Sequence, residues 1–266
     1  AAMVIIDHKT GYVTGCTGGL GKKTEPRSLN RATQSIRQTG SAIKPIAVLA
    51  PAISKKMITA ASIYDDTERD FAEGYHPTDY NPSLGKVTVR RAVESSQNIP
   101  FVEIMEKLKP SKSIKFLEKM GVTTLTEEDN NLVLALGGLQ KGISPLEMAG
   151  AYATIANDGV YIEPTFYNKI ENKNGTLIIK SKQKSRRVFS KEVAYILKEL
   201  LTQPVTGTNG TATYCAISGI DVAAKTGTTD ENYDRWLCGF TPYYTAVTWY
   251  GYDQNESIHF NKKNPA

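Results

Sequence analysis

The stretch that decides the fold lies near the end of the chain and reads Ile220-Asp-Val-Ala-Ala-Lys-Thr-Gly-Thr-Thr-Asp-Glu-Asn-Tyr-Asp-Arg-Trp-Leu-Cys-Gly-Phe-Thr-Pro-Tyr-Tyr-Thr-Ala-Val-Thr-Trp-Tyr-Gly-Tyr252. Residues 220–224, 235–240 and 245–252 have the length and the apolar content of β-strands. Pro242-Tyr-Tyr gives the last two strands a tight connection. The stretch therefore predicts three strands at the carboxyl end of the chain.

The opening residues add two more strands. Residues 3–7 and 12–16 are short apolar runs, and the turn between them contains Gly11. The segment between the two ends of the chain mostly indicates helices, with amphipathic patterns at residues 87–96, 100–108, 111–119 and 145–157. Strands at both ends can pair into one mostly antiparallel sheet, so we predict an α+β fold.

This division gives one domain with two lobes. We expect a sheet lobe from about residues 1–40 and 160–266 and an inserted, all-helical lobe from about residues 55–158. A cleft between the sheet and the helical lobe is the natural place for a site.

The amino-acid composition argues against several classes of function. The chain has 266 residues, of which 40% are hydrophobic and 22% charged, which is typical of a globular protein with a sizeable core. The net charge of +5 is small, so we expect no nucleic-acid partner. The longest apolar run has about eight residues, and we expect neither a membrane span nor a signal peptide. The three cysteines have no metal-site spacing, so we expect no metal.

Ser41-Ala-Ile-Lys44 is the first motif that could support catalysis. Two other Ser-x-x-Lys matches exist, but only Ser41 opens an apolar helix, which runs towards Met57. Residues at positions i and i+3 share a helix face, so Lys44 can reach the Ser41 hydroxyl. A lysine becomes a plausible general base when burial or a second cation lowers its pKa. The motif predicts a serine nucleophile with a lysine base.

Two further motifs follow in sequence. In Ser96-Gln97-Asn98, the serine could relay a proton and the asparagine could hold a peptide amide, although Ser28-Leu-Asn30 has the same form. Lys225-Thr-Gly-Thr228 follows the apolar run 220–224 and is expected at a strand edge, where Gly227 lets a backbone approach a ligand closely. Its threonine hydroxyls and its lysine can bind a carboxylate.

The order of the three motifs resembles that of the penicillin-recognising serine acyltransferases, which include penicillin-binding proteins and serine β-lactamases. The wider sequence is similar to the transpeptidase domain of class A penicillin-binding proteins, because Arg37-Gln-Thr-Gly-Ser-Ala-Ile-Lys-Pro-Ile46 resembles that family's nucleophile segment. Further matching segments are Leu134-Ala-Leu-Gly-Gly138, Gly142-Ile-Ser-Pro-Leu-Glu-Met-Ala149, Ala151-Tyr-Ala-Thr-Ile-Ala-Asn157, Lys225-Thr-Gly-Thr-Thr229, Asp234-Arg-Trp236 and Gly239-Phe-Thr-Pro242.

The resemblance implies a five-stranded, mostly antiparallel sheet of the β-lactamase and transpeptidase type, and it implies a reaction. Ser41 would attack a D-Ala-D-Ala stem peptide of peptidoglycan and form an acyl-enzyme, which an amine from a neighbouring stem would resolve into a cross-link. Lys44 would take the serine proton, and Ser96 and Lys225 would handle the proton delivered to the leaving amine. β-Lactam antibiotics would acylate the same serine, and no cofactor is needed.

The resemblance also assigns binding roles. Asn98 would hold the donor peptide, while Thr226, Gly227 and Thr228 would bind around the terminal carboxylate. The backbone N–H groups of Ser41 and Thr228 would form an oxyanion hole. The family also carries a glycosyltransferase domain and a membrane anchor, which we expect to be absent from this chain. The parent protein would be attached to the membrane through that missing segment and act on the outer face of the bacterial cell membrane.

Three related functions remain open on sequence grounds. A class A β-lactamase needs a deacylating glutamate and usually has aspartate at the position that Gln97 occupies here. A D-Ala-D-Ala carboxypeptidase would use water in place of the acceptor amine. A non-catalytic β-lactam sensor would use the same nucleophile once, as a signal.

Overall fold

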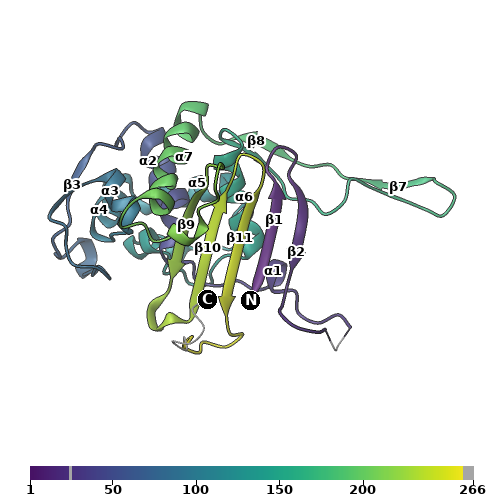
Figure 1. Ribbon diagram of the computed structural model, residues 1–266, viewed down its shortest axis with the longest axis horizontal. Helices are drawn as coiled ribbons and strands as arrows, with labels where there is room; N and C mark the ends of the chain where they lie inside the picture. The colour runs from purple at the N-terminus through teal and green to yellow at the C-terminus, as the bar shows by residue number, and fades with distance from the viewer. Residues whose placement is uncertain (24–25, 260–266) are drawn as a thin grey trace.

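A single antiparallel sheet of five strands forms one side of the protein. The computed structural model describes residues 1–23 and 26–259. The sheet has the order β2-β1-β11-β10-β9, and each neighbouring pair is antiparallel (Figure 1). Its strands are β1 (Ala2–Asp7), β2 (Tyr12–Thr17), β9 (Ala223–Thr228), β10 (Asp234–Phe240) and β11 (Thr245–Gly251). The two ends of the chain pair through β1 and β11, which confirms the predicted α+β class.

The position of β9 differs from the prediction. We expected a strand at 220–224 that ended before the lysine, whereas β9 begins at Ala223 and runs through Thr228. The Lys-Thr-Gly motif is therefore part of the edge strand itself. Lys225 and Gly227 are buried on one face of β9, and Thr228 is exposed on the other. Side chains alternate along a strand, so a buried lysine continues the inward face that the apolar residues begin.

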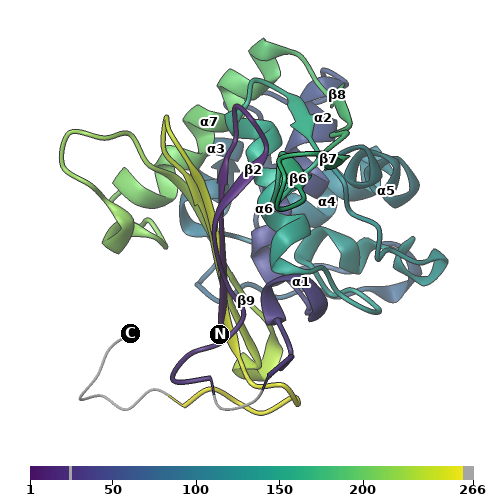
Figure 2. The same cartoon turned by 90° about the vertical axis from the view of Figure 1, so that its right-hand side faces the viewer.

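Helices cover one face of the sheet. Figure 2 shows the sheet nearly edge-on, with α2, α4, α5 and α6 on the same side. The helix α6 lies at the centre and is buried around almost its whole circumference, which is typical of a core helix. The α-helices are α1 (Arg31–Gln34), α2 (Ala50–Ser54), α3 (Val89–Ser95), α4 (Ile99–Leu108), α5 (Pro110–Lys119), α6 (Pro145–Ala156) and α7 (Lys191–Thr206).

Capping residues set several helix starts. Ser144 and Glu147 form a capping box at the start of α6, and the Ser190 hydroxyl accepts a hydrogen bond from the Val193 N–H at the start of α7. The helix that we expected at 87–96 begins only at residue 89, because the Thr88 side chain caps it by accepting from the Arg91 N–H. Short 3₁₀ turns lie at Ala72–Gly74, Glu127–Asp129, Leu132–Leu136, Thr213–Cys215 and Asp230–Asn232.

We expected the inserted lobe to be all-helical, and this prediction was wrong. It contains a two-stranded antiparallel sheet of β3 (Ile63–Asp65) and β4 (Lys86–Thr88), whose three-residue strands are too short to show a clear alternation in sequence. Two more strand pairs follow the lobe: β5 (Val160–Ile162) with β8 (Ser185–Arg187), and β6 (Lys169–Glu171) with β7 (Leu177–Lys180).

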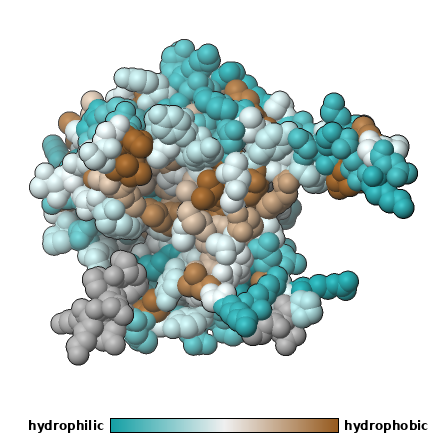
Figure 3. All heavy atoms as spheres, turned by 45° about the vertical axis from the view of Figure 1, so that its right-hand side comes forward, coloured by the Kyte–Doolittle hydropathy of each residue, from teal (hydrophilic) through white to brown (hydrophobic). Residues whose placement is uncertain are grey.

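The hairpin of β6 and β7 projects from the body of the molecule, and its surface is largely hydrophilic (Figures 1 and 3). Within residues 1–23 and 26–259, the helices are all too short or too polar to cross a membrane.

Candidate active site

Ser41 lies in an irregular helical segment that packs inside the lobe. The segment consists of a 3₁₀ turn at Gly40–Ile43, a π-helical stretch at Pro45–Leu49 and then α2. It confirms the predicted helix, which ends at Ser54 rather than near residue 57.

Prolines explain part of the irregularity of this segment. Pro45 has no N–H for the Ala42 carbonyl, and the Tyr152 hydroxyl donates to that carbonyl at 2.6 Å instead. Pro51 likewise has no N–H for the Ala47 carbonyl, which accepts from the Ser113 hydroxyl at 2.6 Å. Both hydroxyls come from buried positions on other helices, so the turn that carries Ser41 is fixed by tertiary contacts.

Two glycines bring β9 against this turn. Gly40 has φ +51°, and a Cβ there would lie 2.3 Å from the Thr228 carbonyl oxygen. A Cβ on Gly227 would lie 2.3 Å from the Thr39 carbonyl oxygen and 2.8 Å from the Ala42 Cβ. We expected Gly227 to let a ligand approach the backbone. In the structure, the backbone that it admits is that of the turn carrying Ser41.

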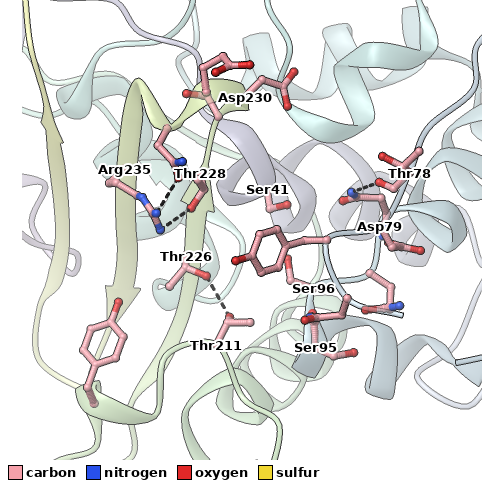
Figure 4. Close-up of a pocket in the computed structure, with 18 residues that line it drawn as sticks. Ser41, Thr78, Asp79, Ser95, Ser96, Thr211, Thr226, Thr228, Asp230 and Arg235 are labelled. Carbon is pink, nitrogen blue, oxygen red and sulfur yellow. Dashed lines mark hydrogen bonds between the residues drawn. The ribbon is translucent and has the colours of Figure 1, made fainter. Parts of the chain in front are cut away.

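A cleft of about 710 Å³ opens between β9 and the inserted lobe. Five of the eight site residues expected from the sequence line it, namely Ser41, Ser96, Asn98, Thr226 and Thr228. Figure 4 shows Ser41, Ser96 and Thr226 around the same opening. The other three, Lys44, Gly227 and Lys225, are buried and do not line the cleft.

Lys44 is completely buried, and its amine is fully engaged. The Nζ atom donates to the Ser96 carbonyl at 2.9 Å, to the Gln97 carbonyl at 2.7 Å and to Asn98 Oδ1 at 2.7 Å. We expected this amine to reach the Ser41 hydroxyl, but no hydrogen bond joins the two side chains in the described part of the chain. Burial, and then the charge of Lys225, lower the pKa of Lys44 well below its ordinary value. Burial thus favours the neutral form, in which the amine has two N–H groups and can donate to only two of these three acceptors at a time.

Lys225 contacts Ser96 as well, through the side chain of that serine and not its carbonyl. Its Nζ donates to Ser96 Oγ at 2.7 Å and to the Thr226 carbonyl at 3.1 Å. Burial lowers the pKa of Lys225 to about 7. Cys238 is its partner in the strand register, and burial raises the pKa of that thiol, which therefore stays neutral. Because Lys225 is only 1% exposed, it is not placed to receive a carboxylate in the cleft.

Ser96 connects the two lysines through an unusual backbone conformation. It has φ +61°, in the left-handed region that non-glycine residues rarely occupy. Its carbonyl accepts from Lys44 while its hydroxyl accepts from Lys225. The hydroxyl thus contacts Lys225 and lines the cleft, while the backbone of the same residue contacts Lys44.

Arg235 also lines the cleft, although it was not among the site residues that we predicted. Among the described residues that line the cleft, Arg235 is the only cation. It donates to Thr228 Oγ1 at 3.2 Å and to Asn232 Oδ1 at 2.7 Å. Thr226 Oγ1 donates to Thr211 Oγ1 at 2.9 Å. Arg235 faces Thr228 in the strand register, a juxtaposition that no local sequence pattern reveals.

Across residues 1–23 and 26–259, histidine, cysteine and carboxylate side chains form no group of three that could hold a metal ion.

A family model and the similar curated proteins point to the same family. The family model for "Penicillin binding protein transpeptidase domain" matches residues 1–263. The chain is 35% identical over 279 residues to penicillin-binding protein 1A of Clostridium acetobutylicum, covering 100% of this chain and 34% of that protein. It is 36% identical over 266 residues to penicillin-binding protein 1F of Bacillus subtilis, covering 97% of this chain and 36% of that protein. The chain thus spans about a third of the length of these relatives.

Solved structures agree with this match. The crystal structure of penicillin-binding protein 1A from Haemophilus influenzae superposes with a TM-score of 0.84 at 26% identity, covering 96% of this chain and 43% of that one. The PonA1 protein from Mycobacterium tuberculosis in complex with penicillin V superposes with a TM-score of 0.80 at 27% identity, covering 93% of this chain and 68% of that one.

Proposed function

The chain belongs to the penicillin-binding protein transpeptidase family, and on this basis we propose that it is a serine D-Ala-D-Ala transpeptidase that cross-links peptidoglycan stem peptides through a Ser41 acyl-enzyme. The observation that carries the proposal is the position of Ser96, which accepts hydrogen bonds from Lys44 and Lys225 beside the cleft that Ser41 lines. The parent protein would act on the outer face of the bacterial cell membrane and would be acylated by β-lactams.

Formation of the acyl-enzyme begins at Ser41. Its Oγ attacks the carbonyl carbon of the penultimate D-Ala, and its proton passes to the neutral Lys44 amine. The neutral Lys44 amine has only two N–H groups, so we propose that its lone pair turns towards Ser41 on substrate binding while it keeps two of its three present acceptors. Catalytic hydrogen bonds often tighten only once substrate is bound. The backbone N–H groups of Ser41 and Thr228 are proposed to stabilise the oxyanion, and such a donor contributes about 3 kcal/mol.

Collapse of this intermediate breaks the bond between the carbonyl carbon and the nitrogen of the terminal D-Ala. That nitrogen needs a proton, and Ser96 Oγ is placed to supply it and to be reprotonated by Lys225. A pKa of about 7 gives Lys225 comparable amounts of both protonation states near neutral pH. An amine from a neighbouring stem then attacks the ester and passes a proton through Ser96 to the neutral Lys225, while the Lys44 ammonium returns its proton to Ser41 Oγ as the ester bond breaks, which completes the cross-link.

The substrate's terminal carboxylate needs a cation, and we assign that role to Arg235 together with the Thr226 and Thr228 hydroxyls. Arg235 already donates to Thr228 Oγ1, so a carboxylate bound there would lie within its reach. Asn98 is proposed to hold the donor peptide, while its Oδ1 keeps the hydrogen bond to Lys44.

The test is a reaction of this chain with a stem peptide ending in D-Ala-D-Ala and an amine acceptor. We expect release of D-Ala and formation of the cross-linked dimer, both measured by mass spectrometry. Release of D-Ala without dimer would make the protein a carboxypeptidase, and the absence of both products would contradict the proposal. Ser41→Ala serves as the matched control and should give neither product.

A further inference from the structure

Two aspartates connect the loop between β3 and β4 to the Ser96–Asn98 turn: Asp66, which is buried, and Asp79, which is partly buried and lines the cleft. The Asp66 side chain is completely buried. Its Oδ2 accepts from the Leu84 N–H at 2.8 Å and from Gln97 Nε2 at 2.5 Å. Gln97, the middle residue of the Ser-x-Asn motif, is therefore a hydrogen-bond donor to Asp66. An aspartate at position 97 would instead place a second acceptor against the first.

Asp79 holds the last residue of the same motif. Its Oδ1 accepts from the Asn98 backbone N–H. The neighbouring Thr78 carbonyl accepts from Asn98 Nδ2 at 2.7 Å. The first contact fixes the Asn98 backbone, and the second orients its side-chain amide, whose Oδ1 accepts from the Lys44 amine. A chain of contacts thus runs from Asp79 to the proposed general base.

The remaining oxygens of the two aspartates have no ordinary donor. Asp66 Oδ1 and Asp79 Oδ2 are both buried and lack a hydrogen-bond partner within the described residues. The two side chains are nevertheless within hydrogen-bonding reach of each other. Two carboxyl groups can form such a bond only when one of them carries a proton. Burial is the main cause that raises the pKa of Asp79 to about 6, and the charge of Asp66 adds to it.

From this geometry we propose that Asp79 carries a proton that it donates to the Asp66 carboxylate, and that the two aspartates act as positioning residues that hold Asn98, and through it the Lys44 amine, in place for the Ser41 reaction. The proposal rests on the proposed function, because it concerns the base of that reaction.

The charges around this carboxyl pair set the direction of its effect. Asp79 is acted on by Asp66, from its own loop, and by Lys44, from the helical segment behind Ser41. Asp79 also accepts from the neutral Asn98 backbone N–H at the start of α4, and Asp66 accepts from the neutral Gln97 amide. Loss of the Asp79 proton leaves two adjacent negative charges, which raise the pKa of Lys44 and favour its ammonium form. Deprotonation of the pair therefore opposes catalysis.

The experiment compares acylation by a fluorescent penicillin across pH in the wild type and five variants. Asp79→Asn keeps an oxygen for the Asn98 N–H and supplies a permanent N–H towards Asp66. Asp79→Asn should be acylated at about the wild-type rate near pH 5 and at least three times faster than the wild type near pH 8. Asp79→Ala, which lacks both atoms, should lose about tenfold at every pH. Asp70→Asn is the control, because this carboxylate of the same loop is 82% exposed and, among the described residues, bonds only to His76.

The double variant gives the sharpest test. Asp66→Asn alone also supplies one donor between the two residues, so either single variant keeps the bond. Asp66→Asn with Asp79→Asn places two NH₂ groups opposite each other with no acceptor, and we expect a loss of about tenfold or more although each single change is mild. The inference would be overturned if the double variant were as active as the two single variants. It would also be overturned if the acylation rate of Asp79→Asn relative to the wild type did not change with pH.

Thermal unfolding separates this inference from the proposed function. The raised pKa of Asp79 means that the folded state keeps its proton between about pH 4 and pH 6 while the unfolded state loses it, so wild-type stability falls over that range. Asp79→Asn should remove this fall even if the wild type reacts with no penicillin. A wild type that is unreactive but keeps the fall contradicts only the proposed function. If the stability of Asp79→Asn falls between pH 4 and pH 6 as steeply as that of the wild type, the proposed proton between Asp79 and Asp66 is wrong.

Discussion

Replacing Gly227 with alanine tests how closely β9 must approach the turn that carries Ser41. The backbone of Gly227 is not in the left-handed region, so the effect of a methyl group is steric. Its Cβ would lie 2.3 Å from the Thr39 carbonyl oxygen, about 1 Å closer than an ordinary carbon–oxygen contact. The nearest atom belongs to the backbone and cannot rotate away, so the strand or the turn must move by a similar distance.

The displacement should lower both stability and activity. Overpacking of this kind costs about 1–3 kcal/mol, which corresponds to a fall of roughly 5 °C in Tm for a domain of this size. A shift of about 1 Å between β9 and Ser41 would slow acylation by about 100-fold. Differential scanning calorimetry and acylation by a fluorescent penicillin measure the two effects.

The matched control is Gly19→Ala. The Cβ at that position meets only the end of the Arg31 side chain, at 3.3 Å, so Tm and the acylation rate should stay close to the wild type. The reasoning is refuted if Gly227→Ala behaves like this control, because the backbone contact would then have no role in forming the site.

Three further outcomes follow from the site. Tyr152→Phe leaves the Ala42 carbonyl without its donor and should lower the free energy of unfolding by about 1–3 kcal/mol in urea titrations; an unchanged midpoint would show that the hydroxyl does not fix the turn. Because burial lowers the pKa of Lys225 to about 7, folding releases its proton and stability should rise as the pH increases from 7 towards 10.5; Lys225→Met should flatten that rise, and a slope as steep as the wild type would contradict the assignment. Arg235→Ala should lower kcat/KM for the stem peptide about tenfold, with partial recovery in Arg235→Lys, whereas equal kinetics in all three proteins would remove Arg235 from carboxylate binding.

Much of the fold was accessible from sequence because its elements are locally coded. The strands at the two ends of the chain alternate or are continuously apolar, and helix starts such as Ser190 carry capping residues. The misplaced start of β9 has a physical cause. A lysine normally ends an apolar run at the surface, whereas Lys225 is buried because Ser96 and the Thr226 carbonyl accept its hydrogen bonds.

The site was predictable only where motifs are local. Ser41 and Lys44 are one turn apart in sequence, so their proximity follows from helix geometry. Asp66, Asp79 and Arg235 reach the site through tertiary pairing: two lie on a loop between short strands, and one faces Thr228 across the sheet. No spacing rule connects such residues, and a single sequence gives no signal for them. The contact of Lys44 with the Ser96–Asn98 turn likewise depends on the left-handed conformation of Ser96.

Intact-mass spectrometry after exposure to penicillin tests the nucleophile assignment most directly. The account predicts a mass increase equal to one penicillin molecule, with the adduct mapped to the peptide that contains Ser41 and absent from Ser41→Ala. An adduct on another residue, or an unmodified wild-type protein, would contradict it.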